Sequence, residues 1–268
     1  MKDKVVIITG ASSGIGKALA FEMAARKAKV VIAARSADKL AGIEAEITKY
    51  GAQVLAVKTD VSSEDECRQL ILAAVERFGK IDILVNNAGI SMRALFKDLD
   101  LNVIRHLMDV NFWGTVYCTK YALPYLITSK GSVVGVSSVA GFKGLPGRTG
   151  YSASKFAIQG FLETLRIENR KTGLHVLIAC PGFTSSNIRN TALAADGSQQ
   201  GESPMDEKSL MAPEKVAVKI ADAIVKRRRI LVMTAVGWWT VSINKLLPGF
   251  MDRMVYDHFA NEPDSPFK

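Results

Sequence analysis

The chain has 268 residues, of which 48% are hydrophobic and 23% charged, and its formal net charge is +9. This length suits one large α/β domain, and the apolar share supplies a full core, which excludes an intrinsically disordered chain. The three cysteines lack metal-ligand spacing and cannot form a fully paired disulfide framework. We therefore expect no metal site and a reducing compartment.

The N-terminus and the charge pattern add two expectations. Met1 to Lys4 lead directly into an apolar run without a secretory signal, and no apolar run is long enough to span a membrane, so we expect a cytoplasmic protein. The tight basic run 226–229 has no interleaved aromatic residues. It is interpreted as a solvated face, which argues against a nucleic-acid partner and leaves phosphate-rich ligands or an anionic membrane surface as minor alternatives.

Short apolar runs alternate along the chain with segments of helical length. Because the runs are apolar throughout, they indicate strands that are covered on both faces. Strands are predicted at 5–8, 30–32, 54–57, 83–85, 133–136, 176–179 and 230–233. Helices are predicted at 16–27, 37–49, 63–78, 99–128, 154–172 and 213–228. The alternation predicts a doubly wound parallel sheet of the Rossmann type, a single-domain, three-layer α/β/α sandwich.

Two regions break this rhythm. Residues 184–212 are long and polar, and a loop of this length is typical of a lid or a binding loop. Residues 236–257 carry apolar side chains at a spacing compatible with one helical face. We therefore divide the chain into a catalytic domain, 1–235, which includes the substrate loop, and a C-terminal extension, 236–268.

A glycine-rich turn follows the first predicted strand and opens a helix. Glycine permits positive φ and close approach of the backbone, and the helix N-terminus offers unpaired amides to a pyrophosphate. The glycines do not follow the commonest GxGxxG spacing. The predicted phosphate-binding residues are Gly10, Ser12, Ser13, Gly14, Ile15 and Gly16.

The choice of cofactor is predicted from the end of the second strand. An enzyme that uses NAD typically places an acid there, about 20 residues beyond the glycine turn, to bind the ribose 2′-hydroxyl. This chain has Arg35 and Ser36 instead. A guanidinium can hold a 2′-phosphate through charge-assisted hydrogen bonds, and the serine hydroxyl can donate beside it. The sequence therefore favours NADP(H) over NAD(H).

Tyr151 and Lys155 are four residues apart, which places them on one face if this segment is helical. A free tyrosine titrates near ~10, too high for acid–base work at neutral pH, and a nearby ammonium lowers that pKa. Ser138, just past a predicted strand, can donate to a substrate oxygen and stabilise its developing charge. Together the three residues predict a site that moves a proton while a carbonyl and an alcohol interconvert.

With these residues in place, the sequence resembles the short-chain dehydrogenase/reductase superfamily over residues 1–235. The resemblance rests on the motifs TGASSGIG (9–16), Asp60-Val61, NNAG (86–89), Asn111, Ser138, YSASK (151–155) and Pro181-Gly182-Phe183-Thr184. It implies that Tyr151 is the proton donor and acceptor and that Ser138 orients the carbonyl. Lys155 would bind the nicotinamide ribose and lower the tyrosine pKa. Asn111 would hold a water in a proton relay to Lys155.

The resemblance also implies the remaining cofactor contacts. Adenine would meet Asp60 and Val61. The groove would be lined by Asn87, Ala88 and Gly89. The nicotinamide would be enclosed by Pro181, Gly182, Phe183 and Thr184.

Finer resemblances and the partners complete these expectations. Ala34-Arg35-Ser36 and VSSVAG (136–141) are similar to the 11β-hydroxysteroid dehydrogenase group, and 244–249 is similar to its dehydrogenase/reductase member 7 branch. We expect a small-molecule carbonyl or alcohol substrate and a homodimer or homotetramer. Trp238 and Trp239 are expected to pack over the substrate cleft or against a second subunit, with peripheral membrane contact as the alternative.

Two other functions share the same motifs. A 3-oxoacyl carrier-protein reductase would fit them, but such reductases usually end soon after their last strand, whereas this chain continues beyond Val236. A catalytically idle NADP(H)-binding sensor or scaffold is the other reading. The joint presence of the four predicted catalytic residues argues against it.

Overall fold

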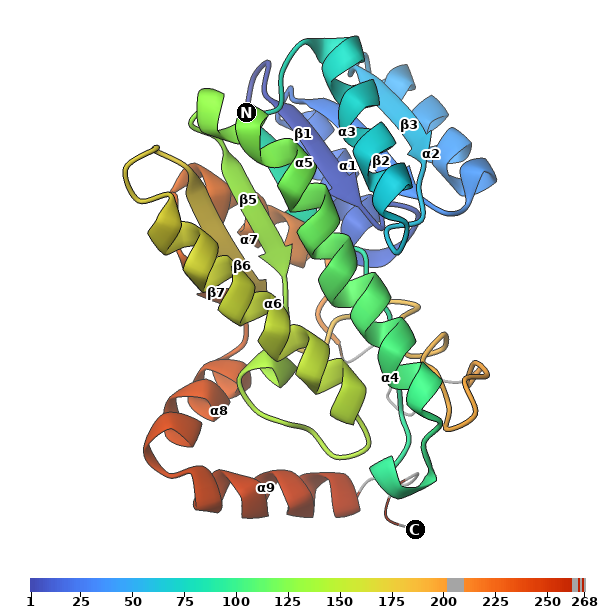
Figure 1. The fold of residues 1–268 in the computed structure, drawn as a ribbon, viewed down its shortest axis with the longest axis vertical. Coiled ribbons are helices and arrows are strands. Elements are labelled where there is room, and N and C mark those ends of the chain that lie inside the picture. Colours follow the sequence, from blue (N-terminus) through green and yellow to red (C-terminus); the bar gives the residue numbers. More distant parts are fainter. Residues whose placement is uncertain (202–209, 262–264, 266, 268) are drawn as a thin grey trace.

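The computed structural model describes residues 1–201, 210–261, 265 and 267. Over these residues the chain forms a sheet of seven parallel strands in the order β3-β2-β1-β4-β5-β6-β7 (Figure 1). The strands are β1 (Val5–Thr9), β2 (Lys29–Ala34), β3 (Val54–Lys58), β4 (Ile83–Asn86), β5 (Ser132–Val136), β6 (His175–Cys180) and β7 (Ile230–Val232). The predicted doubly wound parallel sheet is confirmed.

The strands form because they are short, apolar and covered on both faces. Every residue of β1, β4, β5 and β6 is buried, as the uninterrupted apolar runs predicted. The edge strands are less covered: β3 is mostly half-buried and β7 is partly exposed. The most deeply buried part of the sheet is therefore formed by the strands whose ends carry the predicted site.

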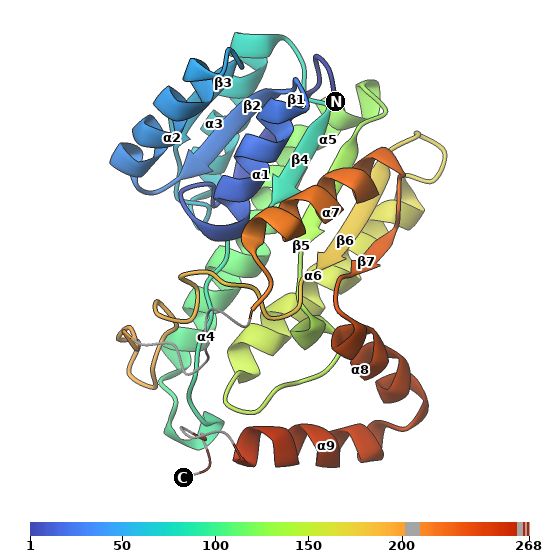
Figure 2. The ribbon, with the colours of Figure 1, turned by 180° about the vertical axis from the view of Figure 1, so that it is seen from behind.

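Helices cover both faces of the sheet, which gives the predicted three layers. One face is covered by α1 (Gly14–Ala25), α2 (Ala37–Lys49) and α7 (Pro213–Val225), seen in front in Figure 2. The other face is covered by α3 (Glu64–Phe78), α5 (Gly114–Thr128) and α6 (Thr149–Glu168), seen in front in Figure 1. Each layer packs its buried apolar side chains against one face of the strands.

The segment predicted as one helix over 99–128 is divided into three parts. It begins as α4 (Leu101–Leu107), widens into a π-helical turn over Met108–Trp113 and continues as α5. A π-helical turn inserts one extra residue into the helix, which rotates the side chains that follow it, and such turns are frequent at functional sites. The apolar spacing alone does not distinguish this turn from a regular α-helix.

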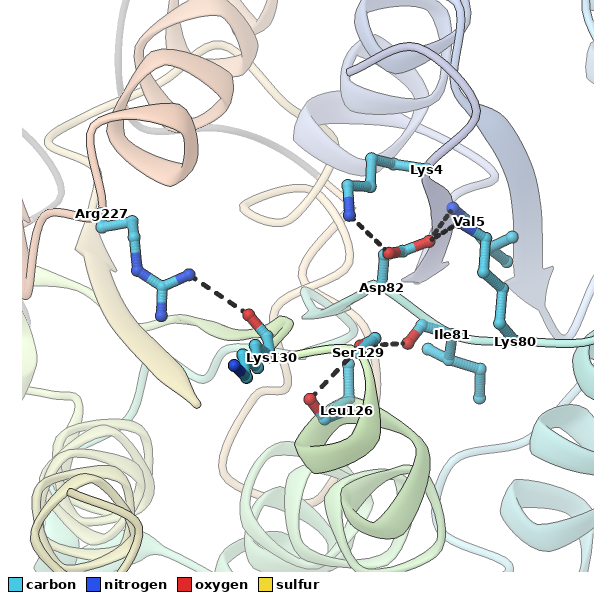
Figure 3. Close-up of polar contacts among 9 residues, drawn as sticks. All are labelled: Lys4, Val5, Lys80, Ile81, Asp82, Leu126, Ser129, Lys130 and Arg227. Atoms are coloured by element: carbon cyan, nitrogen blue, oxygen red, sulfur yellow. Dashed lines mark hydrogen bonds and ion pairs between the residues drawn. The ribbon is translucent and has the colours of Figure 1, made fainter. Parts of the chain in front are cut away.

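The amino edge of the sheet is held by a buried carboxylate (Figure 3). Asp82 Oδ1 accepts a hydrogen bond from Lys4 Nζ at 2.7 Å. Its Oδ2 accepts from the Val5 backbone N at 2.9 Å and lies 2.9 Å from Lys80 Nζ. Burial raises the pKa of Asp82, but these donors outweigh it and hold the pKa below its ordinary value. Asp82 therefore ties the start of β1 to the segment that leads into β4.

Arg227 makes a second tie at the same edge, also drawn in Figure 3. Its guanidinium donates to the carbonyl of Lys130 at 3.3 Å and to that of Gly173 at 2.6 Å. The basic run 226–229 is exposed, as predicted, but this one member of it also anchors the turns that precede β5 and β6.

The C-terminal extension forms two helices where the sequence suggested one face of a single helix. These are α8 (Ala235–Leu246) and α9 (Pro248–Ala260). The break falls at Leu247 because a residue before proline is disfavoured in the helical conformation, and Pro248 then begins α9. In both views α9 lies below the carboxyl ends of the strands (Figures 1 and 2).

The two tryptophans of α8 are more than half exposed, and whether they cover the substrate cleft or a second subunit stays a prediction. Trp238 is 53% exposed and Trp239 58% exposed. The same helix turns Gly237 toward the body of the protein, since Gly237 is buried against Val139. Among the described residues, no helix is both long and apolar enough to span a bilayer.

Candidate active site

The predicted site residues meet at the carboxyl edge of the sheet. All strands run parallel, so the segments that follow them lie at one edge, and the strand order reverses between β1 and β4. Open α/β sheets bind ligands in the crevice at such a reversal. The glycine turn follows β1, Asn87 follows β4, Ser138 follows β5 and Pro181 follows β6.

The turn between β1 and α1 requires glycine at two positions. Gly10 has φ +66°, and a Cβ on it would lie 2.7 Å from Ala88 Cα. A Cβ on Gly16 would lie 2.3 Å from the Gly10 carbonyl oxygen. Within the described chain the Ser13 side chain does not cap α1, which leaves the first amides of that helix to a ligand. The turn therefore fits a pyrophosphate held at a helix N-terminus.

The remaining members of the predicted phosphate turn are at least partly accessible to solvent. Ser13 is exposed, and the half-buried members are Ser12, Gly14 and Ile15. Gly14, the first residue of α1, has φ +52°.

The end of β2 presents the residues that were predicted to select the cofactor. Arg35 is exposed, and Ser36 is the N-cap residue of α2. Asp60 follows β3 and accepts hydrogen bonds from the Ser62 backbone N at 3.0 Å and hydroxyl at 2.7 Å. Burial raises the pKa of Asp60, but the Ser62 bonds and the Arg35 charge outweigh it and lower the pKa. Asp60 is thus a charged acceptor beside the buried Val61.

Thr9, which was not among the predicted site residues, connects the two loops that border the crevice. Its hydroxyl accepts from the backbone N of Asn87 at 3.0 Å and of Ala88 at 3.1 Å. The Asn87 amide donates back to the carbonyls of Thr9 at 2.9 Å and Gly10 at 3.3 Å. The signal for Thr9 was its place as the first residue of the glycine motif.

The π-helical turn places Asn111 between the segment after β4 and α6. Its Oδ1 accepts from the Ile90 backbone N at 2.8 Å, and its Nδ2 donates to the Ile90 carbonyl at 3.0 Å and to Ser154 Oγ at 2.9 Å. A Cβ on Gly89 would lie 3.1 Å from Asn111 Oδ1 and 3.5 Å from Lys155 Nζ, so the three residues meet. The role of Asn111 in a water relay stays a prediction.

Ser138, Tyr151 and Lys155 form one cluster. Ser138 follows β5 and caps the 3₁₀ turn Val139–Gly141 by accepting from the Ala140 backbone N at 3.2 Å. Tyr151 lies in the first turn of α6, close enough to Ser138 for that hydroxyl to lower its pKa. Lys155 lies one turn later, with Nζ 5.7 Å from the centre of the Tyr151 ring. The cluster brings a phenol, a hydroxyl and an ammonium together.

Burial controls the titration of this cluster. It raises the pKa of Tyr151, and this outweighs the Ser138 hydroxyl and the charges of Arg148 and Arg189, which lower it. Burial also lowers the pKa of Lys155 to about 8. Burial therefore dominates the pKa of Tyr151, and the lowering of that pKa by Lys155 stays a prediction. The Lys155 ammonium is itself desolvated, and its Nζ donates a hydrogen bond to the Val136 carbonyl at 3.0 Å.

The segment after β6 closes the base of the predicted substrate loop. Pro181 is buried and Phe183 is exposed, and Thr184 donates its hydroxyl to the Gly182 carbonyl at 3.0 Å. The backbone N of Met211 donates to the Phe183 carbonyl at 3.2 Å, which joins the two ends of 184–212. Residues 202–209 of this loop lie outside the described part of the chain.

The predicted substrate loop 184–212 and the segment before α6 are both hydrogen-bonded to the loop that follows β4. The Arg93 backbone N donates to the Leu193 carbonyl at 2.9 Å, and the Ala94 backbone N donates to the Gly147 carbonyl at 2.9 Å. Arg148 and Arg189 lie close enough to Tyr151 to act on its charge. No sequence motif marked these two arginines, because loop conformation decides which way they face.

The comparisons with known proteins agree with this geometry. Residues 4–196 match the short chain dehydrogenase family. The chain is 34% identical to 11-beta-hydroxysteroid dehydrogenase A of Sesamum indicum over 97% of this chain and 78% of that protein. It is 41% identical to 11-beta-hydroxysteroid dehydrogenase 1A of Arabidopsis thaliana over 69% of this chain, a match that spans only 53% of that relative.

Two solved structures are also similar. A short chain dehydrogenase/reductase of Burkholderia phymatum in complex with NAD has a TM-score of 0.84 and 26% identity over 93% of this chain and 95% of that one. An alcohol dehydrogenase of Thermococcus sibiricus complexed with 5-hydroxy-NADP has a TM-score of 0.76 and 26% identity over 87% of this chain and 95% of that one.

The chain therefore belongs to the short chain dehydrogenases, a class of Rossmann-fold oxidoreductases. Within them it falls in the branch of the 11β-hydroxysteroid dehydrogenases, and it is an oxidoreductase that acts on CH–OH groups with a nicotinamide cofactor.

Proposed function

We propose that the chain is an NADP(H)-dependent enzyme that interconverts a carbonyl and a secondary alcohol, with Tyr151 as general acid and base. The observation that carries the proposal is the cluster of Ser138, Tyr151 and Lys155 beside the glycine turn. A hydroxyl, a phenol and an ammonium at a ligand crevice are the groups needed to bind a carbonyl oxygen and deliver a proton to it.

In the direction of reduction, each residue of the cluster has a separate task. The bound nicotinamide cofactor supplies the hydride. Ser138 donates to the substrate oxygen, and Tyr151 donates its phenolic proton to that oxygen as negative charge develops there. The phenol is protonated at neutral pH, and because burial raises its pKa, it depends on a nearby positive charge to give up that proton. Lys155 then stabilises the phenolate through its positive charge and holds the ribose hydroxyls.

The preference for NADP(H) is proposed from the exposed guanidinium at the end of β2. Arg35 is exposed there and Ser36 opens α2 beside it, so a 2′-phosphate would meet both a cation and a hydroxyl. The position at which an NAD-dependent enzyme typically carries an acid is occupied by Arg35 in this chain. Of the two similar structures, one contains an NADP derivative and the other NAD, so the choice for this chain rests on its own residues.

We also propose a homodimer or homotetramer with a small-molecule carbonyl or alcohol as substrate. Trp113 and Phe156 are 43% and 46% exposed, on two elements that pack together, the π-helical turn and α6. This apolar surface supports burial against a second subunit. Trp238 and Trp239 on α8 offer a second exposed apolar surface, which a tetramer or a lipid surface would cover.

The experiment is turnover on a panel of carbonyls with the Tyr151→Phe variant. NADPH oxidation is followed with ketosteroids first, because the relatives carry that name, then with retinals, 3-oxoacyl thioesters, sugars and simple ketones. Loss of the phenolic proton should lower kcat by about 10² to 10⁴-fold while the Kd for NADPH stays within about 2-fold. Tyr50→Phe, at an exposed tyrosine far from the crevice, is the control.

Two outcomes would count against the proposal. If Tyr151→Phe retains the turnover of the unmodified protein, the tyrosine is not the proton donor. If the unmodified protein binds NADPH but turns over no carbonyl or alcohol of the panel, a cofactor-binding sensor explains the site better.

A further inference from the structure

We propose that Lys143 and Asp252 are positioning residues: through this ion pair the C-terminal helix α9 holds the segment that joins Ser138 to Tyr151. The inference rests on the proposed function, because it assigns the extension a task in the proposed reaction. It goes further in naming the contacts by which a segment after the Rossmann domain acts on the catalytic cluster.

The segment between the two catalytic side chains is irregular, and its attachment to the loop after β4 lies near its end, where the Gly147 carbonyl accepts from the Ala94 backbone N at 2.9 Å. After the 3₁₀ turn ends at Gly141, the chain runs without regular structure until α6 begins at Thr149. Inside this stretch the Leu145 backbone N donates to Ser152 Oγ at 3.3 Å, and the Arg148 backbone N donates to the Leu145 carbonyl at 3.2 Å. The placement of Ser138 relative to Tyr151 therefore depends on what holds the middle of this segment.

The extension binds that middle at two consecutive residues. The Asn244 amide of α8 donates to the Phe142 carbonyl at 3.0 Å. The Lys143 ammonium forms an ion pair and hydrogen bond with the Asp252 carboxylate of α9. Both contacts join residues more than a hundred positions apart in the sequence. Figure 1 shows α9 running beneath the loop that precedes α6.

The start of α8 abuts the same part of the site. A Cβ on Gly237 would lie 2.8 Å from the Val139 side chain, in the 3₁₀ turn that Ser138 caps. A Cβ on Gly182 would lie 2.5 Å from the Thr234 side chain, which caps α8. The extension thus begins in van der Waals contact with the segments after β5 and β6 and then reaches the catalytic segment through α9.

Apolar packing and polar ties both attach α9. Met251 and Phe259 of this helix are buried. Between the helix and the segment lies an open groove of about 490 Å³, lined in part by Leu145, Pro146, Val255 and Tyr256. The ion pair at the border of this groove is the polar attachment of the segment to α9.

The exposure of the two partners indicates that Lys143 depends on Asp252 more than Asp252 depends on Lys143. Lys143 is 8% exposed as a residue, whereas the side chain of Asp252 is 72% exposed. A buried ammonium is stable only while an opposite charge compensates for lost hydration. Without the carboxylate, Lys143 would turn toward water and take Phe142 and Gly144 with it. That movement would disturb Ser138 and Tyr151 while leaving the glycine turn in place.

The test compares Asp252→Asn with the conservative Asp252→Glu, and with Asp257→Asn as a control at an exposed acid of the same helix. Turnover of NADPH is measured with the best carbonyl of the panel, alongside NADPH binding and hydrogen exchange of peptides covering 139–150. For Asp252→Asn we expect kcat to fall by about 10-fold or more, an NADPH Kd within about 2-fold, and faster exchange of these peptides. Asp252→Glu should restore all three values, and Asp257→Asn should change none.

A double-mutant cycle adds a second criterion. In a Lys143→Met background, which removes the buried charge and keeps most of the side-chain stem, Asp252→Asn should have no further effect on kcat or exchange. Additive losses, or unchanged exchange and kcat in Asp252→Asn, would overturn the proposal. Hydrogen exchange can be measured without turnover. The exchange result therefore still tests the contact between α9 and the segment if Tyr151→Phe proves active and the proposed function is wrong.

Discussion

Replacing Gly16 by alanine tests whether the closure of the glycine turn is what binds the cofactor. A Cβ at this position would lie 2.3 Å from the Gly10 carbonyl oxygen and 2.6 Å from the Asn87 amide nitrogen. Real Cβ contacts stay above 3.0 Å, so the first distance must grow by at least 0.7 Å. Since the obstructing atom belongs to the backbone of the turn, the turn itself must open.

The magnitude follows from the hydrogen bonds that an opened turn would lose. A hydrogen bond to a charged group is worth about 1.5 to 3 kcal/mol, so loss of one backbone amide to a phosphate raises the Kd by about 10- to 100-fold. The assay is NADPH binding by calorimetry, with thermal unfolding of the cofactor-free protein in parallel. The variant should still unfold cooperatively while its affinity falls.

Gly160→Ala is the matched control, since it makes the same change in a helix. A Cβ on Gly160 in α6 meets nothing within 4 Å, so alanine should stabilise the helix by about 0.5 to 1 kcal/mol and raise the melting temperature by roughly 1 to 4 °C. Its NADPH Kd should be unchanged. If Gly16→Ala binds NADPH as tightly as Gly160→Ala does, the close approach is not what forms the phosphate site, and the reasoning fails.

Three further predictions concern the cofactor, pH and assembly. Arg35→Ala should raise the Kd for NADPH by about 10-fold or more and leave that for NADH nearly unchanged; equal effects would refute the 2′-phosphate assignment. Asp82→Asn should lower the free energy of unfolding at pH 7 by about 2 kcal/mol. Because the folded pKa is lowered, this advantage is present above the unfolded value of ~3.9 and lost as pH falls through the folded pKa, so urea unfolding of the two proteins should converge in acid. Replacing Trp238 and Trp239 by serine should reduce the assembly size in light scattering and leave vesicle flotation unchanged; loss of flotation alone would favour a lipid contact.

The parallel arrangement of the strands and the edge of the sheet that carries the site were predictable because local patterns indicate them. Uninterrupted apolar runs specify strands covered on both faces, and alternation with helices specifies parallel pairing. These two rules bring the ends of β1, β4 and β5 to one edge. They thereby place Gly10, Asn87 and Ser138 together, although these residues lie far apart in the chain.

Other features depend on contacts that no local pattern carries. The π-helical turn over Met108–Trp113 differs from an α-helix by one extra residue, and apolar spacing is too coarse to detect it. The break at Leu247 was readable from Pro248, but the direction of α9 was not. The pairing of Lys143 with Asp252 joins two ordinary surface residue types across the length of a domain, so only the folded chain reveals it.

The buried carboxylate of Asp82 also bears on where a resin or a fusion partner can be joined to this protein. Because Lys4 and Val5 are bound to it, the first residues leave the fold at the amino edge of the sheet. Figures 1 and 2 place that edge at the opposite end of the molecule from α9. A resin or fusion partner joined before Met1 would thus leave the crevice open to solution, whereas one joined after α9 would crowd its entrance.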